Sequence, residues 1–280
     1  MRCLVCDGEA VRPIGTSADW LAMLPADPSD ERRGILERAG RAGWGADFTF
    51  LRCADCGFIR IDPQPDTALL GRFYAQYHAT EKYAAKAPKK IRRARRRIQR
   101  LRTMVPGRSF IDVGCNVGFA VEAARMAGFT ATGIDIDPDA VATARRQFPG
   151  CAFQTSDIAG FAAQGERFDV VYCAEVIEHI TEVRAFVAAL SMLTRGGGLL
   201  YLTTPDAGHI RVRNRFLSWN EVKPPEHLCW FSKNSLRCAF EAAGFRIERF
   251  GLNMKPGIRM IARKLPDGPS TPRDGKRTRA

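Results

Sequence analysis

The sequence predicts an α/β fold built from consecutive βαβ units, with a small cysteine-rich module in front of it. Two observations lead to this prediction. From about residue 110 onward, short apolar runs alternate with amphipathic stretches, which is the pattern of strands and helices in α/β proteins. Ahead of them stand two Cys-x-x-Cys pairs, at residues 3–6 and 53–56, whose spacing suits a structural metal.

The central unit is the stretch FIDVGCNVGFAVEAARMAGFTATGIDIDP, residues 110–138. Its first apolar run, Phe110–Val113, suits a buried strand, and Gly114 and Gly118 bracket a turn with little side-chain bulk. A helix with small apolar residues at helical spacing follows, and the second strand, Thr130–Asp135, ends on an acid. In such a unit we expect a ligand crevice above the carboxyl ends of the strands.

The rest of the domain continues the alternation. Pro138 begins the next helix, with Asp137 as its N-cap, and Ser232 caps a later helix that ends before Gly244. The other expected helices and strands are, in chain order, the helices 118–127, 138–148 and 184–193, the strands 152–155, 168–173 and 198–203, and the closing strands 246–252 and 258–263.

The glycine spacing bears on which cofactor the unit could hold. A dinucleotide site requires G-x-G-x-x-G, whereas this chain has Gly114-Cys-Asn-Val-Gly118 and no third glycine. The spacing therefore counts against a dehydrogenase. Taken alone, the unit could also be a glycine turn that serves packing and binds nothing.

The two cysteine pairs predict a closed tetrahedral zinc site formed by Cys3, Cys6, Cys53 and Cys56. The second pair lies between apolar segments that read as a β-hairpin of a zinc ribbon, and the 46 intervening residues imply an insertion with a short helix near 29–39. The alternative is two redox-active or buried thiol pairs. Nine scattered cysteines do not indicate a disulfide framework, and we expect a cytoplasmic protein.

The net charge of +13 is concentrated in one segment. Between Lys82 and Arg108 there are four lysines, eight arginines and no acid. Apolar residues recur at helical spacing over 86–105, so this segment predicts an amphipathic helix whose seven arginines from Arg92 to Arg102 face solvent. A solvated face and a site for an anionic substrate or nucleic acid are both compatible with this pattern. No apolar run approaches the roughly 20 residues of a membrane span.

The central unit resembles motif I of the class I S-adenosylmethionine-dependent methyltransferases. Their D-x-G-x-G-x-G pattern matches Asp112, Gly114 and Gly118, with Asn116 in place of the middle glycine. The segments QTSDIAGF, DVVYCAEVIEHI and GGGLLYLTTPD are similar to later motifs of this family and follow in the family's order. The resemblance implies an enzyme with a doubly wound, Rossmann-like sheet of seven strands, the last inserted antiparallel.

The same resemblance implies the positions that would bind S-adenosylmethionine. The loop would cradle the methionine part through its backbone, Asp135 would accept from the ribose hydroxyls, and Asp157 with Ile158 would bound the adenine. For Asp157 a helix cap is a competing role. The full set of expected cofactor-binding residues is Asp112, Gly114, Cys115, Asn116, Gly118, Asp135, Ile136, Asp157, Ile158, Cys173 and Ala174.

The acceptor side resembles two groups of methyltransferases. The segment KPPEHLCWFSKNSL is similar to the E-H stretch of sugar C-methyltransferases that carry an N-terminal zinc module, which makes Glu226 and His227 candidates for the base. Pro224 stands where those enzymes have a tyrosine. The set Glu175, Glu178 and His179 is similar to the divalent-cation motif of ubiquinone-type O-methyltransferases, and His179 is alternatively an acid/base partner.

We therefore predict a methyltransferase that acts on a small molecule, preferably a sugar nucleotide or another anionic metabolite. An RNA methyltransferase that uses the arginine helix and a non-catalytic adaptor are the alternatives. Tyr74 or Tyr77 could line the acceptor pocket or pack a linker helix. The expected divisions are a zinc-ribbon-like module at 1–62, a linker and basic helix at 63–108, the methyltransferase domain at 109–264 and a disordered basic tail at 265–280.

Overall fold

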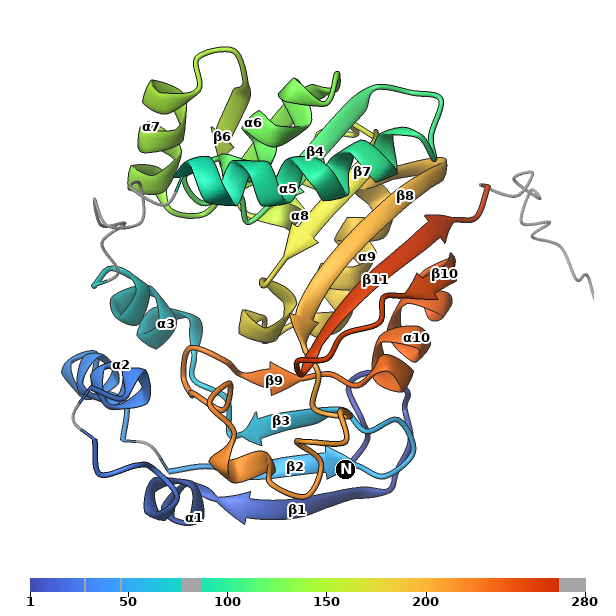
Figure 1. Ribbon diagram of the computed structural model, residues 1–280. Helices are drawn as coiled ribbons and strands as arrows, with labels where there is room; N and C mark the ends of the chain where they lie inside the picture. The colour runs from blue at the N-terminus through green and yellow to red at the C-terminus, as the bar shows by residue number, and fades with distance from the viewer. Residues whose placement is uncertain (28, 46, 77–86, 267–280) are drawn as a thin grey trace, which may run out of the picture.

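The computed structural model describes residues 1–27, 29–45, 47–76 and 87–266. Two sheets form its framework, one of seven strands and one of four (Figure 1). The smaller sheet lies at the end toward which strands β7 and β8 of the larger sheet point (Figure 1). An isolated bridge between Asp206 and Phe231 adds a backbone contact beyond the end of β8.

The larger sheet has the strand order β10-β11-β8-β7-β4-β5-β6. The pairs β4–β5, β4–β7, β5–β6 and β7–β8 are parallel, and β11 is antiparallel to both β8 and β10. This order confirms the predicted seven-stranded, doubly wound sheet with the last strand inserted antiparallel. The strands are β4 (Ser109–Val113), β5 (Thr130–Asp135), β6 (Ala152–Thr155), β7 (Phe168–Ala174), β8 (Thr194–Pro205), β10 (Phe245–Phe250) and β11 (Gly257–Lys264).

Helices cover both faces of this sheet because successive strand residues point to opposite sides. Ile111 and Val113 of β4 pack in one buried cluster with residues of α8, α9 and α10. Phe110, which precedes Ile111 and points to the opposite side, belongs to a second cluster with residues of α5, α6 and α7. The helices are α5 (Ala87–Arg102), α6 (Phe119–Met126), α7 (Pro138–Gln147), α8 (Ile158–Ala162), α9 (Val183–Leu193) and α10 (Lys233–Ala242).

The arginine-rich helix α5 buries Ile98 and Leu101 against this second face. The prediction that all its arginines face solvent is wrong for Arg95, Arg97 and Arg102, which are half-buried. The Arg97 guanidinium interacts with the hydroxyl of Tyr172 on β7. Burial lowers the pKa of Arg97, but Tyr201 and Tyr172 together raise it more, so this pKa lies above its ordinary value. A long arginine side chain can cover apolar surface with its stem, which explains this departure from a simple two-faced helix.

The smaller sheet is antiparallel and has the order β1-β2-β3-β9. Strands β2 and β3 form the hairpin expected around the second cysteine pair, whereas neither β1 nor the two-residue β9 was predicted. The elements of this part are β1 (Val11–Thr16), α1 (Ser17–Ala22), α2 (Glu31–Arg41), β2 (Thr49–Cys53), β3 (Ile59–Asp62), α3 (Thr67–Tyr74), the 3-10 turns η1 (Ile177–His179) and η2 (Phe216–Ser218), and β9 (Cys229–Trp230).

The core of the smaller sheet combines residues from two segments that are far apart in the sequence. Trp20, Phe50 and Ile61 pack with Phe216 and Trp230, which come from the segment after β8. The Trp20 indole also donates to the Val222 carbonyl at 3.0 Å. The division of the chain at residue 62 stays a prediction, and the cysteine-rich part shares its sheet and its core with the segment that leads to α10.

Several predicted boundaries differ by a few residues from those observed. The helix expected to start at Ser29 starts at Glu31, because Asp30 caps it by accepting from the Arg32 amide. The strand expected over 198–203 runs over the whole of β8, Thr194–Pro205. Most of the predicted tail, 267–280, lies outside the described residues. Within the described part of the chain, no helix combines the length and apolarity that a bilayer crossing requires.

Candidate active site

The turn after β4 has a backbone that few residues could adopt. Gly114 and Gly118 have φ angles of 75° and 84°. A Cβ on Gly114 would lie 2.5 Å from a Val176 methyl, and one on Gly118 would lie 2.7 Å from the Phe153 ring. Both positions therefore require glycine for space as well as for conformation. They hold the start of α6 close to the ends of β4 and β5.

Asn116, which departs from the family pattern, also has a positive φ, of 48°. Asparagine is the side chain that best tolerates this left-handed region after glycine. Its Oδ1 accepts from the Val117 amide at 2.8 Å, which fixes the turn. The substitution of the middle glycine is thus compatible with the same loop conformation.

Asp135 ties this loop to the end of β5. Its carboxylate accepts from the Asn116 amide at 2.7 Å and from the Asp137 amide at 3.0 Å. Asp137 in turn caps α7, as predicted. Beside Asp135, the large apolar side chain of Ile136 is 65% exposed instead of packing in the core. An acid next to an uncovered apolar side chain suits a ligand with a polar sugar and a flat ring.

Asp112 lies under the loop and is almost fully buried. Burial raises its pKa well above the ordinary value, and the nearby Asp135 carboxylate raises it further. The pKa of Asp135 is raised by burial too, although the amides that it accepts from oppose this. Two carboxyl groups in one poorly solvated place attract a cation, and the methionine end of S-adenosylmethionine carries an ammonium and a sulfonium.

The remaining cofactor candidates lie at the ends of β6 and β7. Asp157 caps α8, with Oδ1 accepting from the Gly160 amide at 2.6 Å, so the competing cap role is present. Ile158 begins that helix and is partly exposed. Cys115 and Cys173 are buried, and Cys173 packs in the core, so their backbones rather than their thiols would meet a ligand. Ala174 is partly exposed at the strand end.

Two histidines from distant segments meet beside the end of β7. The rings of His179 and His227 are edge to face with their centroids 4.8 Å apart. One ring nitrogen from each and one carboxylate oxygen of Glu178 all lie within 4.8 Å of one another. The Leu228 amide donates to the Glu178 carbonyl at 2.8 Å, and this backbone bond holds the two segments together.

The hydrogen bonds of the two rings define their tautomers. His179 Nδ1 lies 2.7 Å from the Glu226 carbonyl oxygen, and His227 Nδ1 lies 2.8 Å from the Glu221 carbonyl oxygen. Since a carbonyl oxygen only accepts, each Nδ1 carries the hydrogen and each Nε2 keeps its lone pair. Burial lowers the pKa of both histidines, and for His227 the neighbouring His179 and Lys223 lower it further. Both rings are therefore neutral near pH 7.

Glu178 is the third member of this group and is only 1% exposed. Its Oε2 accepts from the Thr204 hydroxyl at 2.9 Å, while Oε1 is buried and has no hydrogen-bond partner in the described part of the chain. Burial, followed by the charge of Glu175, raises its pKa well above the ordinary value. Glu175 itself points elsewhere, with its carboxylate 2.5 Å from the Thr203 hydroxyl.

Glu226, the other base candidate, is held by cations. Its carboxylate lies 3.5 Å from Lys223 Nζ and 4.0 Å from an Arg38 guanidinium nitrogen. The Glu226 carboxylate is therefore engaged by these two cations rather than directed at the histidine rings. The Tyr74 hydroxyl is 3.2 Å from His179 Nδ1 and 3.4 Å from the Glu226 carbonyl, and Tyr77 lies outside the described residues.

Some members of this site were not singled out from the sequence. Thr204, whose hydroxyl donates to Glu178, lies in the segment GGGLLYLTTPD. That segment was noted only for its similarity to a family motif. Glu221 and Lys223 were not predicted as site residues, because their roles depend on how the segment after β8 folds back onto η1. Only the three-dimensional arrangement brings these residues to the histidines.

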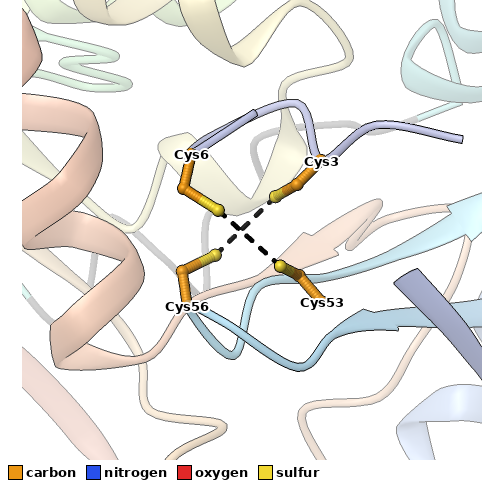
Figure 2. Close-up of side chains that lie close together, drawn as sticks. All are labelled: Cys3, Cys6, Cys53 and Cys56. Carbon is orange, nitrogen blue, oxygen red and sulfur yellow. Dashed lines mark hydrogen bonds between the residues drawn. The ribbon is translucent and has the colours of Figure 1, made fainter. Parts of the chain in front are cut away.

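The side chains of the four predicted zinc ligands point toward one another at the turn between β2 and β3 (Figure 2). The Sγ atoms of Cys3 and Cys56 are 3.7 Å apart, as are those of Cys6 and Cys53, and all four lie within 4.8 Å of one another. Tetrahedral coordination with Zn–S bonds of about 2.3 Å places the sulfurs about 3.8 Å apart. The geometry therefore fits a structural zinc ion.

The protonation chemistry of this cluster also suits a metal. A hydrogen bond from Cys56 lowers the pKa of Cys3 to about 5, whereas burial raises that of Cys6 to about 11. One thiolate is thus formed readily, and the others would lose their protons when a metal binds. The Cys56 carbonyl accepts from the Ser232 hydroxyl at 2.7 Å, which links the cluster to the N-cap of α10.

Comparison with known proteins gives one family match. A sequence model described as "Methyltransferase domain" matches residues 83–249. Among curated relatives, the ubiquinone biosynthesis O-methyltransferase of Methylococcus capsulatus is 36% identical over 107 residues, covering 36% of this chain and 45% of the relative. The enzyme of the same name from Actinobacillus pleuropneumoniae is 27% identical, covering 56% and 78%. The chain thus spans less than half the length of the first of these relatives.

Solved structures share the fold at low identity. The magnesium protoporphyrin IX methyltransferase of Synechocystis, solved with bound SAH, has a TM-score of 0.50 and 20% identity, and covers 70% of this chain and 92% of its own. The YcgJ protein of Bacillus subtilis has a TM-score of 0.52 and 14% identity, and covers 62% and 99%. At these identities the likeness concerns the architecture of the larger sheet and its helices.

Proposed function

This chain belongs to the methyltransferase domain family, and we propose that it transfers a methyl group from S-adenosylmethionine to an oxygen atom of a small-molecule acceptor. The observation that carries the proposal is the meeting of the glycine loop, Asp135 and the two neutral histidines along one edge of the sheet. The first two suit the methyl donor, and the histidines lie where the acceptor would enter.

The donor would bind across the ends of β4, β5 and β6. Gly114 and Gly118 allow its methionine part to approach the backbone, and Asp135 would accept from the ribose hydroxyls. Ile136 would cover one face of the adenine, with Ile158 near its edge. The cofactor itself supplies the electrophilic methyl group, so the protein has to orient the acceptor and remove its proton.

For the proton, His227 is a better candidate than Glu226. Its neutral ring keeps a free Nε2, and the Glu221 carbonyl fixes the ring orientation. Glu226 is engaged by Lys223 and positions His179 through its carbonyl. His179 would then assist as an acid/base partner or an orienting group.

The same residues fit a divalent cation, with His227 in place of the expected Glu175. Glu178 offers an unsatisfied buried oxygen, and both histidines offer Nε2. A cation bound there would lower the pKa of a coordinated acceptor hydroxyl. Titration with Mn²⁺, followed by electron paramagnetic resonance, tests this directly. Binding that is lost in Glu178→Gln and kept in Glu175→Gln supports the site, and no binding by the wild-type protein excludes it.

The acceptor class is supported by the relatives, which are named for O-methylation in ubiquinone biosynthesis. A hydroxyl group on a small molecule is therefore the preferred acceptor, and catechols serve as test compounds for it. A sugar nucleotide remains the second candidate, because the basic residues of α5 suit an anionic metabolite. RNA and a non-catalytic role are the further alternatives.

One experiment separates these four possibilities. The protein is incubated with S-adenosylmethionine and, separately, with catechols, sugar nucleotides and a total RNA preparation, and products are analysed by mass spectrometry. We expect one methyl group to be added to a catechol oxygen. Transfer only to a sugar carbon or to RNA would contradict O-methylation of a small molecule, and absence of transfer with retained donor binding would favour the adaptor.

A further inference from the structure

Arginines gather on the small sheet, away from the histidines, where no role has been assigned to them. Arg12 of β1 stands directly opposite Arg52 of β2 in the antiparallel register. Side chains at opposed positions share one face, and like charges placed so are unfavourable for the sheet. An anion beside the two guanidinium groups would offset this repulsion.

The loop between β8 and β9 brings further positive charge to the same place. Arg213 and Asn214 line a cavity of about 360 Å³ together with Arg52 and the backbone near Gly208. The same three side chains also line an adjoining cavity of about 520 Å³. This second cavity includes Arg215, Phe216 and Ser218 and extends over Ile14, Met23 and Leu217. Because the two cavities share these three side chains, they form one groove. Its arginines lie at one end, and Ile14, Met23 and Leu217 lie at the other.

No aspartate or glutamate lines either cavity. In the described part of the chain, Arg12, Arg52, Arg213 and Arg215 make no salt bridge. Asp206, close in sequence to Gly208, is buried and turns its carboxylate to the Gly208 amide. The positive charge of the groove is thus left for a partner from outside the chain.

We propose that this groove binds the phosphate group of a phosphorylated small molecule, whose less polar part lies over Ile14, Met23 and Leu217. One guanidinium group can donate two parallel hydrogen bonds to two oxygens of a phosphate. Arginine is therefore the preferred cation for such contacts. The cavity volumes fall in the range of small-molecule sites, about 300–1,000 Å³. Ile14, Met23 and Leu217 line the far end, and its one aromatic residue, Phe216, is only 5% exposed. Single-stranded nucleic acid instead stacks on exposed aromatic faces.

The zinc cluster offers a competing reason for one of these arginines. Cys53 lines the first cavity, and four thiolates around Zn²⁺ carry a net negative charge that Arg52 could offset. Arg213 belongs to a different segment, the loop after β8, and is not next to a cysteine ligand in sequence. Its variants therefore separate ligand binding from the stability of the metal site, provided that zinc content is measured in each.

The test uses isothermal titration of the full-length zinc-loaded protein with uridine diphosphate, with uridine and with a short single-stranded RNA. We expect uridine diphosphate to bind, and binding to weaken at least tenfold in Arg213→Gln and in Arg52→Gln. Arg211→Gln, in the same loop but outside both cavities, should bind as the wild type does. Uridine, which lacks phosphate, should not bind measurably.

Three results would overturn the proposal. The first is unchanged affinity for uridine diphosphate in Arg213→Gln with zinc retained, which would place the nucleotide elsewhere, such as at the acceptor site. The second is no binding of uridine diphosphate by the wild type. The third is that the RNA binds and uridine diphosphate does not. Donor binding and methyl transfer are measured on the same variants, so failure of this proposal and failure of the proposed function give different outcomes.

Discussion

At the scale of single residues, the chemistry depends on which ring nitrogen each histidine leaves free. The carbonyls of Glu221 and Glu226 fix the hydrogen on Nδ1 of His227 and His179. A sequence shows that a histidine is present, but not which backbone carbonyl faces it. The two residues were predicted as candidates, whereas their tautomers and their contact with each other required the fold.

His227→Asn tests the role of the ring. The asparagine amide can still donate to the Glu221 carbonyl, but it lacks a basic nitrogen at the position of Nε2. We expect kcat for methyl transfer to fall by about 10²–10⁴ while the affinity for S-adenosylmethionine is kept. His209→Ala, in the loop after β8, is the matched control and should keep its turnover. Equal turnover in His227→Asn and the wild type would remove His227 from the reaction.

Asp112 gives a prediction about pH. Because burial and then Asp135 raise its pKa above 3.8 in the folded protein, the native state binds more protons than the unfolded state above that value. Its contribution to stability is therefore complete below the unfolded pKa and is lost as pH rises through the folded pKa. Without cofactor, the free energy of unfolding should decline more from about pH 5 to about pH 8 in the wild type than in Asp112→Asn. Urea unfolding at both pH values measures it, and parallel declines would contradict the assignment.

At the scale of elements, the β4–turn–α6–β5 unit was predicted almost to the residue. Its glycines, apolar runs and caps are local signals, and the structure places each strand and helix within one or two residues of its expected bounds. The small sheet was predicted only in part. Strand β1 and the two-residue β9 are defined by pairing with distant partners, and neither has a periodic pattern of its own.

The turn in this unit predicts how Asn116 tolerates substitution. Its φ of 48° is accessible to glycine without strain, so Asn116→Gly should keep donor affinity and change stability by less than about 1 kcal/mol. Asn116→Val places a β-branched residue in the left-handed region, which costs on the order of 1–3 kcal/mol. Thermal unfolding and calorimetry with S-adenosylmethionine compare the two. A valine variant as stable as the glycine variant would show that the backbone differs from the one described.

At the scale of the whole molecule, the cysteine cluster connects the two sheets. Cys3, Cys53 and Cys56 belong to the same buried cluster as residues of β7, α9 and α10. Arg184 at the start of α9 donates to the Leu4 carbonyl at 2.7 Å and pairs with Asp7. A metal at the cluster would therefore support the larger domain as well as the cysteine-rich part.

Loss of one ligand tests this connection. Cys56→Ser should lose bound zinc and lower the Tm by on the order of 10 °C. Cys238→Ser changes a half-buried thiol on α10 that is not one of the four zinc ligands. This variant should keep both its bound zinc and its Tm. Zinc content by atomic absorption and scanning calorimetry provide the comparison. A Cys56→Ser protein with unchanged Tm would mean that the cluster does not stabilise the fold.

The central claim is that the unit from Phe110 to Pro138 binds the methyl donor. Its most direct test is calorimetric titration of the wild-type protein, Asp135→Ala and His227→Asn with S-adenosylmethionine. We predict a micromolar dissociation constant for the wild type, a loss of at least about tenfold in Asp135→Ala, equal to about 1.4 kcal/mol, and no change in His227→Asn. No heat of binding in the wild-type protein, or equal affinity in Asp135→Ala, would contradict the account.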